Sequence, residues 1–353
     1  MITIYFNYIF SLNILTNKHP TEQTNNNQSL YFCPMLIIQR TSTDPFVNLA
    51  TEEYLVKNIE EPCFMLWRNT PAVIIGKHQN PLKEVNLTYI QEHQIPVIRR
   101  ISGGGTVYHD LGNINYSFID FGKTESLVNF AKYSSPILQL LQKMDIDAQL
   151  VGKSDLRING LKFSGNASHV HRNRVLHHGT LLFDSNLNIL SDSIKITHDR
   201  IIDKSVPSNR SQVCNIKDHL QKPLTTMEFM NLLIAHIQDV FPDAQKTKLT
   251  EAQEREIQKL VEEKYHKWDW NYAYSPKYQI TSEFLFNQQQ ISSKCLIEKG
   301  LIKNIQLSQP LPAEHQKALD SIIGQQHEKK FISSFIEQHP YTKSLQIVKS
   351  ILF

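Results

Sequence analysis

The stretch RRISGGGTVYHD, residues 99–110, combines two arginines, three consecutive glycines and a His-Asp pair. Glycines 103–105 have no Cβ, so their backbone can adopt positive φ and their N–H groups can converge on a bound anion. Either Arg99 or Arg100 would add a planar charged donor suited to phosphate or carboxylate, and Ser102 would add a hydroxyl. A glycine-rich turn between two strands is the alternative. The flanking arginines and the histidine favour an anion-binding loop.

Strands are predicted on both sides of this loop. PVIRRI at residues 96–101 leads into it, and NINYSFI at residues 113–119 is the strand that follows. Upstream, the β-prone runs CFMLWR and AVIIGK, residues 63–68 and 72–77, are separated by a turn that contains a proline. These two runs are expected to pair with each other.

Three segments have the apolar spacing of helices. They are residues 48–58, residues 86–94, which end before Pro96, and the longer amphipathic run 126–144. Pro136 lies in the middle of the last segment and predicts a kink or a break there.

A second informative segment covers residues 152–184. Asn159-Gly160 is a strong signal for a two-residue hairpin turn, and Arg172-Asn173 falls where a second hairpin would turn. Lys162 therefore lies on a strand that returns as VLHHGTLLF and brings His177 or His178 back toward it. A lysine on a mostly apolar strand is a candidate anion ligand. An edge-strand lysine that prevents aggregation is the alternative.

Four histidines of this segment could be interpreted as a metal cluster. No cysteine or spaced carboxylate accompanies them, however, and a His-x-His pair on a strand is common by chance. A single histidine that points into a pocket is the favoured interpretation. The four are His169, His171, His177 and His178.

Composition limits the class of protein. A chain of 353 residues predicts two domains, and a net charge of +3, from 37 basic and 34 acidic residues, shows no electrostatic footprint for nucleic acid. The cysteines are far apart and form no CxxC pair, which fits a reducing cytoplasm and indicates neither a zinc site nor a disulfide framework. They are Cys33, Cys63, Cys214 and Cys295.

The first 34 residues are expected to be an N-terminal extension outside the fold. The apolar run at residues 1–15 has no leading Lys or Arg and is too short and interrupted to span a bilayer. The polar run KHPTEQTNNNQSL, residues 18–30, has the composition of a disordered segment.

Three motifs in this order resemble those of the lipoate-protein ligases. They are RRISGGGTVYHDLGNINYSF, SDLRINGLKFSGNASH and LHHGTLLF, which begin at Arg99, Ser154 and Leu176. The resemblance extends from Met35 to about Pro242. WDWNYAYSPKY, residues 268–278, is similar to the start of the C-terminal domain in bacterial members of the family. Ser168 and His169 depart from the family, whose members often have an aromatic residue and an arginine there.

The resemblance implies an α+β catalytic fold of the biotinyl and lipoyl ligase type, with mixed β-sheets flanked by helices and a small α+β C-terminal domain. The expected boundaries are residues 35–245 and 250–353. The alternation of hairpin strands with helices agrees with this class. A Rossmann or P-loop fold is excluded because no GxGxxG or GKS/T motif opens a helix after a strand.

The activity that the resemblance implies is the ATP-dependent formation of lipoyl-adenylate and pyrophosphate, followed by transfer of the lipoyl group to a lysine of an acceptor domain. Lys162 would be the catalytic residue, because its ammonium can contact both the lipoyl carboxylate and the α-phosphate. Asp155 would lie beside the nucleotide as a Mg²⁺ contact. The adenylate site would comprise Arg100, Ser102, Gly103, Gly104, Gly105, Thr106, Val107, Tyr108, Asn113, Asp155 and Lys162. The lipoyl arm would contact His109, Gly165, Ala167 and His178.

The partners that the family implies are lipoyl domains of 2-oxoacid dehydrogenase acyltransferase subunits and the glycine-cleavage carrier protein. Two alternatives remain open. One is an octanoyltransferase, which needs an activated cysteine near the pocket, and residues 154–184 contain none. The other is a transferase that takes a preformed acyl donor. The C-terminal domain, which helps to close the site in the family, favours complete ligase activity over such a transferase. A biotin ligase is disfavoured because its arginine-glycine loop is patterned differently from RRISGGG.

Overall fold

A computed structural model of the chain describes residues 34–122, 128–194, 200–338 and 351–352. Apart from residue 34, the expected N-terminal extension lies outside the described residues, as do Cys33 and the first residues of the helix predicted from residue 126. In the part of the chain that is described, no helix has both the length and the apolar character to cross a membrane.

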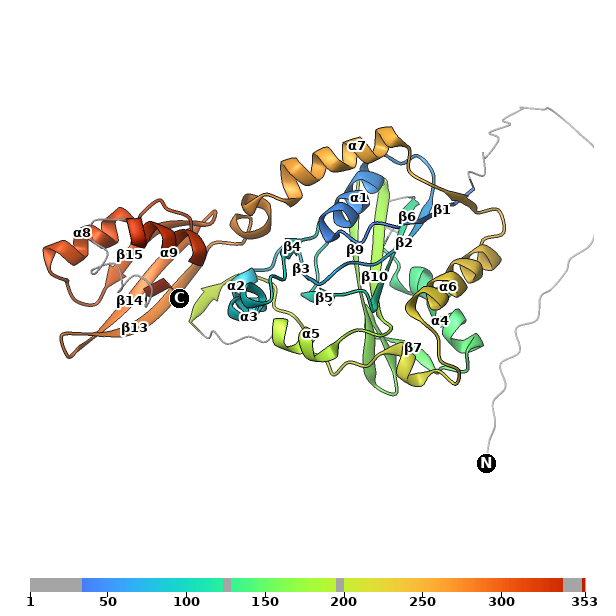
Figure 1. The fold of residues 1–353 in the computed structure, drawn as a ribbon, viewed down its shortest axis with the longest axis horizontal. Coiled ribbons are helices and arrows are strands. Elements are labelled where there is room, and N and C mark those ends of the chain that lie inside the picture. Colours follow the sequence, from blue (N-terminus) through green and yellow to red (C-terminus); the bar gives the residue numbers. More distant parts are fainter. Residues whose placement is uncertain (1–33, 123–127, 195–199, 339–350, 353) are drawn as a thin grey trace, which may run out of the picture. The chain divides into compact units, whose positions relative to one another are not determined.

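Within the described residues, an eight-stranded mixed sheet forms the centre of the fold (Figure 1). Its strands are β1 (Leu36–Gln39), β2 (Cys63–Trp67), β6 (Asn113–Phe121), β7 (Ala148–Val151), β8 (Asp155–Ile158), β9 (Leu161–His171), β10 (Arg174–Leu182) and β12 (Gln245–Thr247). Their order across the sheet is β12-β1-β2-β6-β10-β9-β8-β7. β1 runs parallel to β2 and β12, whereas the pairs from β2 to β7 are antiparallel. The predicted α+β fold with mixed sheets is confirmed.

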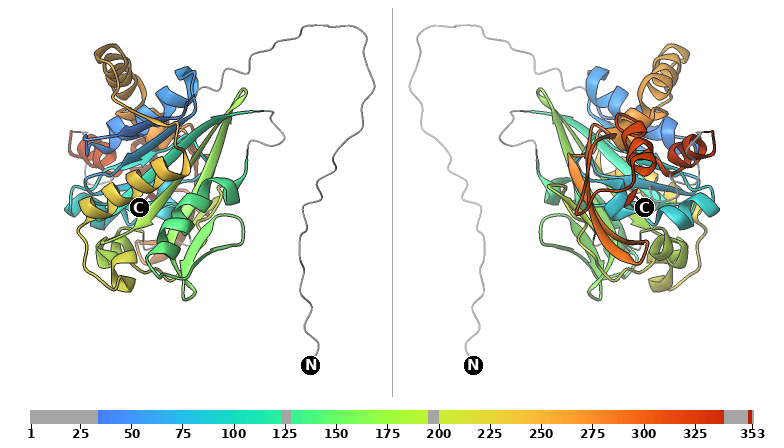
Figure 2. Two further views of the ribbon diagram at one scale, coloured as in Figure 1. Left: turned by 90° about the vertical axis from the view of Figure 1, so that its right-hand side faces the viewer. Right: turned by 90° about the vertical axis from the view of Figure 1, so that its left-hand side faces the viewer.

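Helices cover both faces of this sheet because its central strands are apolar on both sides. In β2, Phe64 and Leu66 face one hydrophobic cluster, and the alternate residues Cys63, Met65 and Trp67 face the other. Helices α4 (Phe130–Lys143) and α6 (Thr226–Val240) pack on the first face, and α1 (Pro45–Asn58) and α7 (Glu251–Leu260) pack on the second. Figure 2 shows the blue α1 and orange α7 on the opposite side of the sheet from the green α4 and gold α6.

Local sequence explains where two of these helices begin. The side chain of Asp44 accepts hydrogen bonds from the N–H groups of Phe46 and Val47, and Pro45 occupies the first turn. The helix predicted from residue 48 therefore begins three residues earlier, at Pro45. In α6, Thr225 and Glu228 form a reciprocal capping box.

The break predicted at Pro136 is absent, since α4 continues through this residue to Lys143. Proline removes one backbone hydrogen bond from a helix. Ile137, directly after it, and Leu141, about one turn further on, are fully buried in the core. Burial of this apolar face stabilises the helix more than the missing hydrogen bond destabilises it.

A separate three-stranded sheet positions residues 100–106, which contain the three glycines and are called the glycine loop. Its strands are β3 (Ala72–Ile75), β4 (Val97–Arg99) and β5 (Val107–His109), in the order β4-β3-β5. The loop connects β4 to β5, so it lies between strands as predicted, but the strand that follows it is β5 and not the predicted strand at residues 113–119, which is β6. Residues of α3 (Leu87–Glu92) and α5 (Leu187–Ser193) pack against the strands of this small sheet in one hydrophobic cluster. The short helix α2 (Pro81–Glu84) precedes α3 in the chain.

The predicted pairing of residues 63–68 with residues 72–77 is wrong. β2 pairs with β1 and β6 in the large sheet, whereas β3 pairs with β4 and β5 in the small one. Residues 68–71 thus carry the chain from one sheet to the other instead of reversing it within a hairpin. Both edges of β2 are hydrogen-bonded to other strands, β1 on one side and β6 on the other.

Both predicted hairpins are present. β8 and β9 are antiparallel across Asn159-Gly160, and both turn residues have positive φ, 50° and 80°. This is the backbone that Asn-Gly adopts in tight hairpin turns. β9 and β10 are antiparallel across the second turn, where Arg172 has a φ of 56°.

A four-stranded sheet forms most of the C-terminal part. Its order is β11 (Ile201–Asp203), β13 (Tyr278–Phe286), β14 (Gln289–Glu298) and β15 (Leu301–Leu307), and helices α8 (Ala313–Ser321) and α9 (Lys329–Gln338) pack with it around one hydrophobic cluster. The predicted small α+β domain is confirmed, although its edge strand β11 comes from the middle of the chain. The boundary between residues 245 and 250 stays a prediction.

Candidate active site

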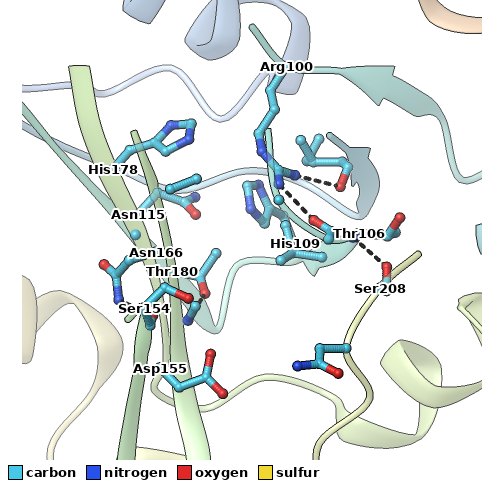
Figure 3. A pocket seen from close by; sticks show the side chains of 18 of the residues that line it. Arg100, Thr106, His109, Asn115, Ser154, Asp155, Asn166, His178, Thr180 and Ser208 are labelled. Atoms are coloured by element: carbon cyan, nitrogen blue, oxygen red, sulfur yellow. Dashed lines mark hydrogen bonds between the residues drawn. The ribbon is translucent and has the colours of Figure 1, made fainter. Parts of the chain in front are cut away.

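A cavity of about 340 Å³ lies between the glycine loop, strands β6, β9 and β10 and residues 206–209. Ligand pockets commonly measure about 300–1,000 Å³. Apolar walls come from Leu49, Trp67 and Ile74, and polar side chains project from the glycine loop and the strands. In Figure 3, Asp155 lies well apart from His178 and Asn115.

Arg100 holds the glycine loop in shape. Its Nε donates to Ser102 Oγ at 3.0 Å, one terminal nitrogen donates to Ile74 O at 3.2 Å, and the other donates to the carbonyl oxygens of Gly103 and Gly105 at 2.7 Å each. Burial lowers the pKa of Arg100 to about 10, so its guanidinium remains charged at neutral pH. One donor of five is left for a ligand, and the positive charge of the group faces the cavity.

The three glycines differ in conformation. Gly104 alone of residues 103–105 has a positive φ, +86°. Gly105 is instead packed against Ser208, whose Oγ would lie 3.1 Å from an added Cβ. A side chain would therefore be strained at Gly104 and crowded at Gly105.

Arg99 takes no part in the cavity. Its side chain is fully buried and donates to Gly76 O, Lys77 O and Gln79 O and, from the other side, to Trp270 O, Asn271 O and Ser275 Oγ. Of the two arginines offered by the sequence as anion ligands, Arg100 is therefore the one at the site. Arg99 attaches residues 270–275 to the turn that follows β3.

Lys162 lines the cavity from β9, and its Nζ lies 2.8 Å from Asp155 Oδ1 on β8. Its backbone N–H donates to Gln212 O at 2.9 Å, and its carbonyl accepts from Cys214 N at 3.1 Å. At Lys162 the strand β9 pairs with β8 on one side and with residues 212–214 on the other, so the interpretation of Lys162 as an edge-strand lysine is wrong.

His178 rather than His177 faces the cavity. Its Nδ1 lies 2.8 Å from Glu52 Oε1, and its Nε2 lies 2.6 Å from Ser102 Oγ. The order Ser-His-Glu resembles a hydrolytic triad, but Ser102 is buried and does not line the cavity. The chain of hydrogen bonds therefore ties α1 to the glycine loop. His177 is buried and stacks on Tyr133 with ring centroids 5.0 Å apart.

Two buried nitrogen atoms of the cavity wall lack a partner among the described residues, His109 Nε2 and Asn115 Nδ2. His109 Nδ1 lies 3.0 Å from Asn69 Nδ2, and Asn115 Oδ1 accepts from Asn113 Nδ2 at 2.9 Å. Burial and the charge of Arg100 lower the pKa of His109 to about 3, so the imidazole is neutral.

A second cavity of about 730 Å³ adjoins the first. Both are lined by Thr106, Val107, Lys162, Gly165, Thr180, Ser208 and Asn209. Its further walls include the apolar side chains of Leu182, Leu187, Leu190 and Ile194. Lys162 therefore lies where the two cavities meet.

The structure brings most of the residues predicted from the sequence to these two cavities. Those that line the first are Arg100, Gly104, Gly105, Thr106, Val107, His109, Asp155, Lys162, Gly165, Ala167 and His178, and Tyr108 lines the second. Ser102, Gly103 and Asn113 line neither. Ser102 and Gly103 contact Arg100, and Asn113 contacts Asn115, so these three act on the cavity through their neighbours.

Several cavity residues had no part in the sequence prediction. For Asn115 the signal is its place in the β-prone run NINYSF, residues 113–118, in which polar and apolar residues alternate. Glu52, Gln79 and Glu84 are buried polar residues beside the cavities. Their burial is visible only in the tertiary structure. The further lining residues of the first cavity are Leu49, Trp67, Ile74, Ser154, Asn166, Gly179, Thr180, Val206, Pro207, Ser208 and Asn209.

The described residues include no cluster of three or more His, Cys, Asp or Glu side chains suited to a metal ion. Mg²⁺ is commonly held by one or two carboxylates together with substrate phosphates. Asp155 fits this requirement, because it lines the first cavity next to Lys162.

Comparisons with known proteins agree on one family. A model of the lipoyl protein ligase A/B catalytic domain matches residues 44–238. The lipoate-protein ligase LplJ of Bacillus subtilis is 36% identical over 310 residues, which cover 86% of this chain and 93% of that protein. A mitochondrial lipoyl amidotransferase of Homo sapiens is 33% identical over 313 residues, which cover 82% of this chain and 81% of that protein.

Two solved structures share the fold. The P. falciparum protein LipL1 in complex with lipoate has 25% sequence identity and a TM-score of 0.58, and the match covers 90% of this chain and 98% of that one. A lipoate-protein ligase A bound with ATP has 26% identity and a TM-score of 0.56, and the match covers 68% of this chain and 98% of that one.

Proposed function

The chain belongs to the lipoate-protein ligase family, and we propose that it activates lipoate with ATP and transfers the lipoyl group to a lysine of an acceptor protein. The position of Lys162 at the junction of two cavities carries this proposal. A reaction that joins a carboxylate to a phosphate needs a cation between the two anions.

The first cavity suits the acyl substrate. Leu49, Trp67 and Ile74 provide apolar surface for a hydrocarbon chain, and Lys162 provides a cation for its carboxylate. The relative LipL1 is in complex with lipoate, which supports lipoate as a ligand of this chain.

The second cavity suits the nucleotide. Its leucine and isoleucine side chains can cover an adenine ring, and the glycine loop and Lys162 lie at its boundary with the first cavity. A relative is bound with ATP, which supports ATP as a ligand of this chain. When bound, Mg²⁺ would neutralise charge on the triphosphate, and Asp155 is the residue that would hold it.

The proposed chemistry has two steps. A carboxylate oxygen of lipoate attacks the α-phosphorus of ATP, and the bond from that phosphorus to pyrophosphate breaks. The neutral amine of an acceptor lysine then attacks the acyl carbon, and AMP leaves with the electron pair of the mixed-anhydride bond. In the first step Lys162 offsets the charge of both reactants. As acceptors we propose lipoyl domains of 2-oxoacid dehydrogenase acyltransferase subunits and the glycine-cleavage carrier protein.

A thioester mechanism finds no support among the described residues. Neither cavity is lined by a cysteine of the described ranges. Burial also raises the pKa of Cys63 and of Cys295 to about 12, which keeps both thiols protonated. Transfer from a preformed acyl donor is the second candidate, because a lipoyl amidotransferase is among the relatives.

One assay separates the two candidates. The full chain is incubated with ATP, Mg²⁺ and lipoate, and pyrophosphate is measured, after which a lipoyl acceptor domain is added and its mass is followed. Pyrophosphate release and a lipoyl mass increase are expected. Transfer from synthetic lipoyl-adenylate without any pyrophosphate release would instead identify a transferase that depends on another activating enzyme.

A further inference from the structure

Two N–H donors that have no partner among the described residues, His109 Nε2 and Asn115 Nδ2, belong to side chains that line the first cavity beside Trp67. We propose that these donors bind the two dithiolane sulfur atoms of lipoate and thereby make the enzyme prefer lipoate to octanoate. The inference rests on the proposed function, because it takes the first cavity as the acyl site.

The hydrogen bonds of His109 fix which ring nitrogen carries the proton. An amide nitrogen can only donate, so Asn69 Nδ2 donates to His109 Nδ1 across 3.0 Å, and Nδ1 must be the unprotonated nitrogen. Because the ring is neutral, its proton lies on Nε2. Nε2 is buried and has no partner among the described residues, so it is a donor in need of an acceptor.

Asn115 presents a donor for a similar reason. Its Oδ1 already accepts from Asn113 Nδ2, and the residue is only 2% exposed. Its amide nitrogen is buried without a partner in the described part of the chain. An unpaired buried donor is unfavourable, and a ligand with acceptor atoms would relieve this.

Both donors lie around the same aromatic side chain. Asn115 is the β6 partner of Trp67 in the sheet register, and the rings of Trp67 and His109 meet edge to face with centroids 5.8 Å apart. Asn115 and His109 both lie apart from Asp155, the partner of Lys162, in Figure 3. An acyl chain whose carboxylate is at Lys162 would therefore place its far end near Trp67, His109 and Asn115.

Lipoate and octanoate differ at the end of the chain that is farthest from the carboxylate, because only lipoate has hydrogen-bond acceptors there. Dithiolane sulfur is a weak hydrogen-bond acceptor and makes favourable contacts with aromatic rings. The terminal methyl group of octanoate offers no acceptor and would leave both donors unpaired. A site built around buried donors discriminates against a ligand that lacks the matching acceptor. Because sulfur accepts weakly, we expect a preference of about tenfold, which corresponds to about 1.4 kcal/mol.

The test compares kcat/KM for pyrophosphate release with lipoate and with octanoate. The variants are Asn115→Leu and His109→Phe, which remove one donor each and keep a side chain of similar size. Thr180→Val is a matched control, because it removes a polar group of the same cavity whose hydroxyl accepts from Gly165 N. The ratio of the two kcat/KM values cancels general losses of activity or of folded protein.

We expect the ratio of lipoate to octanoate to fall severalfold in each donor variant and about tenfold in the double variant, with the control ratio unchanged. An unchanged ratio in both donor variants would overturn the inference. Calorimetric Kd values for the two acids without ATP provide a second measurement. If the wild type releases no pyrophosphate, the proposed activation step fails, and the Kd ratios of wild type and variants still decide whether the donors recognise sulfur.

Discussion

The ammonium of Lys162 lies 2.8 Å from Asp155 Oδ1, across the paired strands β9 and β8. The other oxygen of Asp155 accepts from Arg157 at 3.0 Å. An ammonium has three donors, so Lys162 can bind an anion without giving up Asp155. The carboxylate therefore holds the lysine at the junction of the two cavities before substrates arrive.

The first prediction concerns the charge of Lys162. Lys162→Ala should reduce pyrophosphate release from ATP and lipoate at least about a hundredfold, since removal of one group that stabilises transition-state charge commonly has an effect of this size. The thermal midpoint should change little, because the side chain is partly exposed at the cavity wall. Lys153→Ala, at an exposed lysine in the turn before β8, is the control and should keep normal activity. Wild-type release by the Lys162 variant would show that the residue has no role in activation.

The second prediction concerns Gln79, whose side chain is fully buried between the glycine loop and residues 206–208. Its Oε1 accepts from Gly76 N and Thr106 Oγ1, and its Nε2 donates to Val206 O and Ser208 Oγ, all within 3.2 Å. Gln79→Ala should lower the free energy of unfolding by about 1–3 kcal/mol, because the partners lose their hydrogen bonds.

The same variant should raise KM for ATP about tenfold, which is about 1.4 kcal/mol, because Thr106 and Ser208 line both cavities. Steady-state kinetics with varied ATP and fixed lipoate measures this effect. Gln139→Ala, at an exposed position of α4, serves as the control. A loss of stability without a change in KM would mean that Gln79 supports the fold alone.

Some of this site follows from local sequence and some does not. The glycine loop, the Asn159-Gly160 turn and Lys162 are encoded within a few residues each, so pattern alone predicts them. Arg99 and Arg100 are consecutive residues at the end of β4 and have different partners, but the sequence does not say which of them faces a ligand. That is decided by residues 270–275, which are about 170 positions away and enclose Arg99.

The partner of β2 was mispredicted for a related reason. Short sequence separation favours pairing with β3, because closing a short loop loses little chain entropy. In the structure β2 is buried on both faces between β1 and β6, and this burial decides its place. That pairing, which places Asn115 beside Trp67, cannot be read from the sequence.

The third prediction separates the two arginines. Arg99→Lys should lower the free energy of unfolding by about 3 kcal/mol, because one ammonium cannot replace a planar fork that serves six acceptors and a buried charge would lose its partners. Arg100→Lys should instead reduce kcat/KM, because Arg100 shapes the glycine loop. Urea denaturation and steady-state kinetics on both variants test this difference. Equal effects of the two substitutions on stability and on kinetics would contradict it.

The fourth prediction concerns the dependence of stability on pH. Burial, with a contribution from the nearby His178, lowers the pKa of His177 to about 3, whereas an unfolded histidine titrates near about 6.5. Between these values the unfolded chain binds a proton that the native chain does not bind. The free energy of unfolding therefore falls as the pH falls below about 6.5, by about 1.4 kcal/mol per pH unit for each such histidine.

Urea denaturation at several pH values between about 7.5 and 5 measures this slope. His109 contributes to it in the same way as His177, because its pKa is also lowered to about 3. His177→Phe should reduce the slope by the contribution of one histidine and keep the ring that stacks on Tyr133. His78→Ala, at an exposed position, serves as the control substitution. A wild-type slope in the His177 variant would show that the buried ring takes up its proton without loss of the native state.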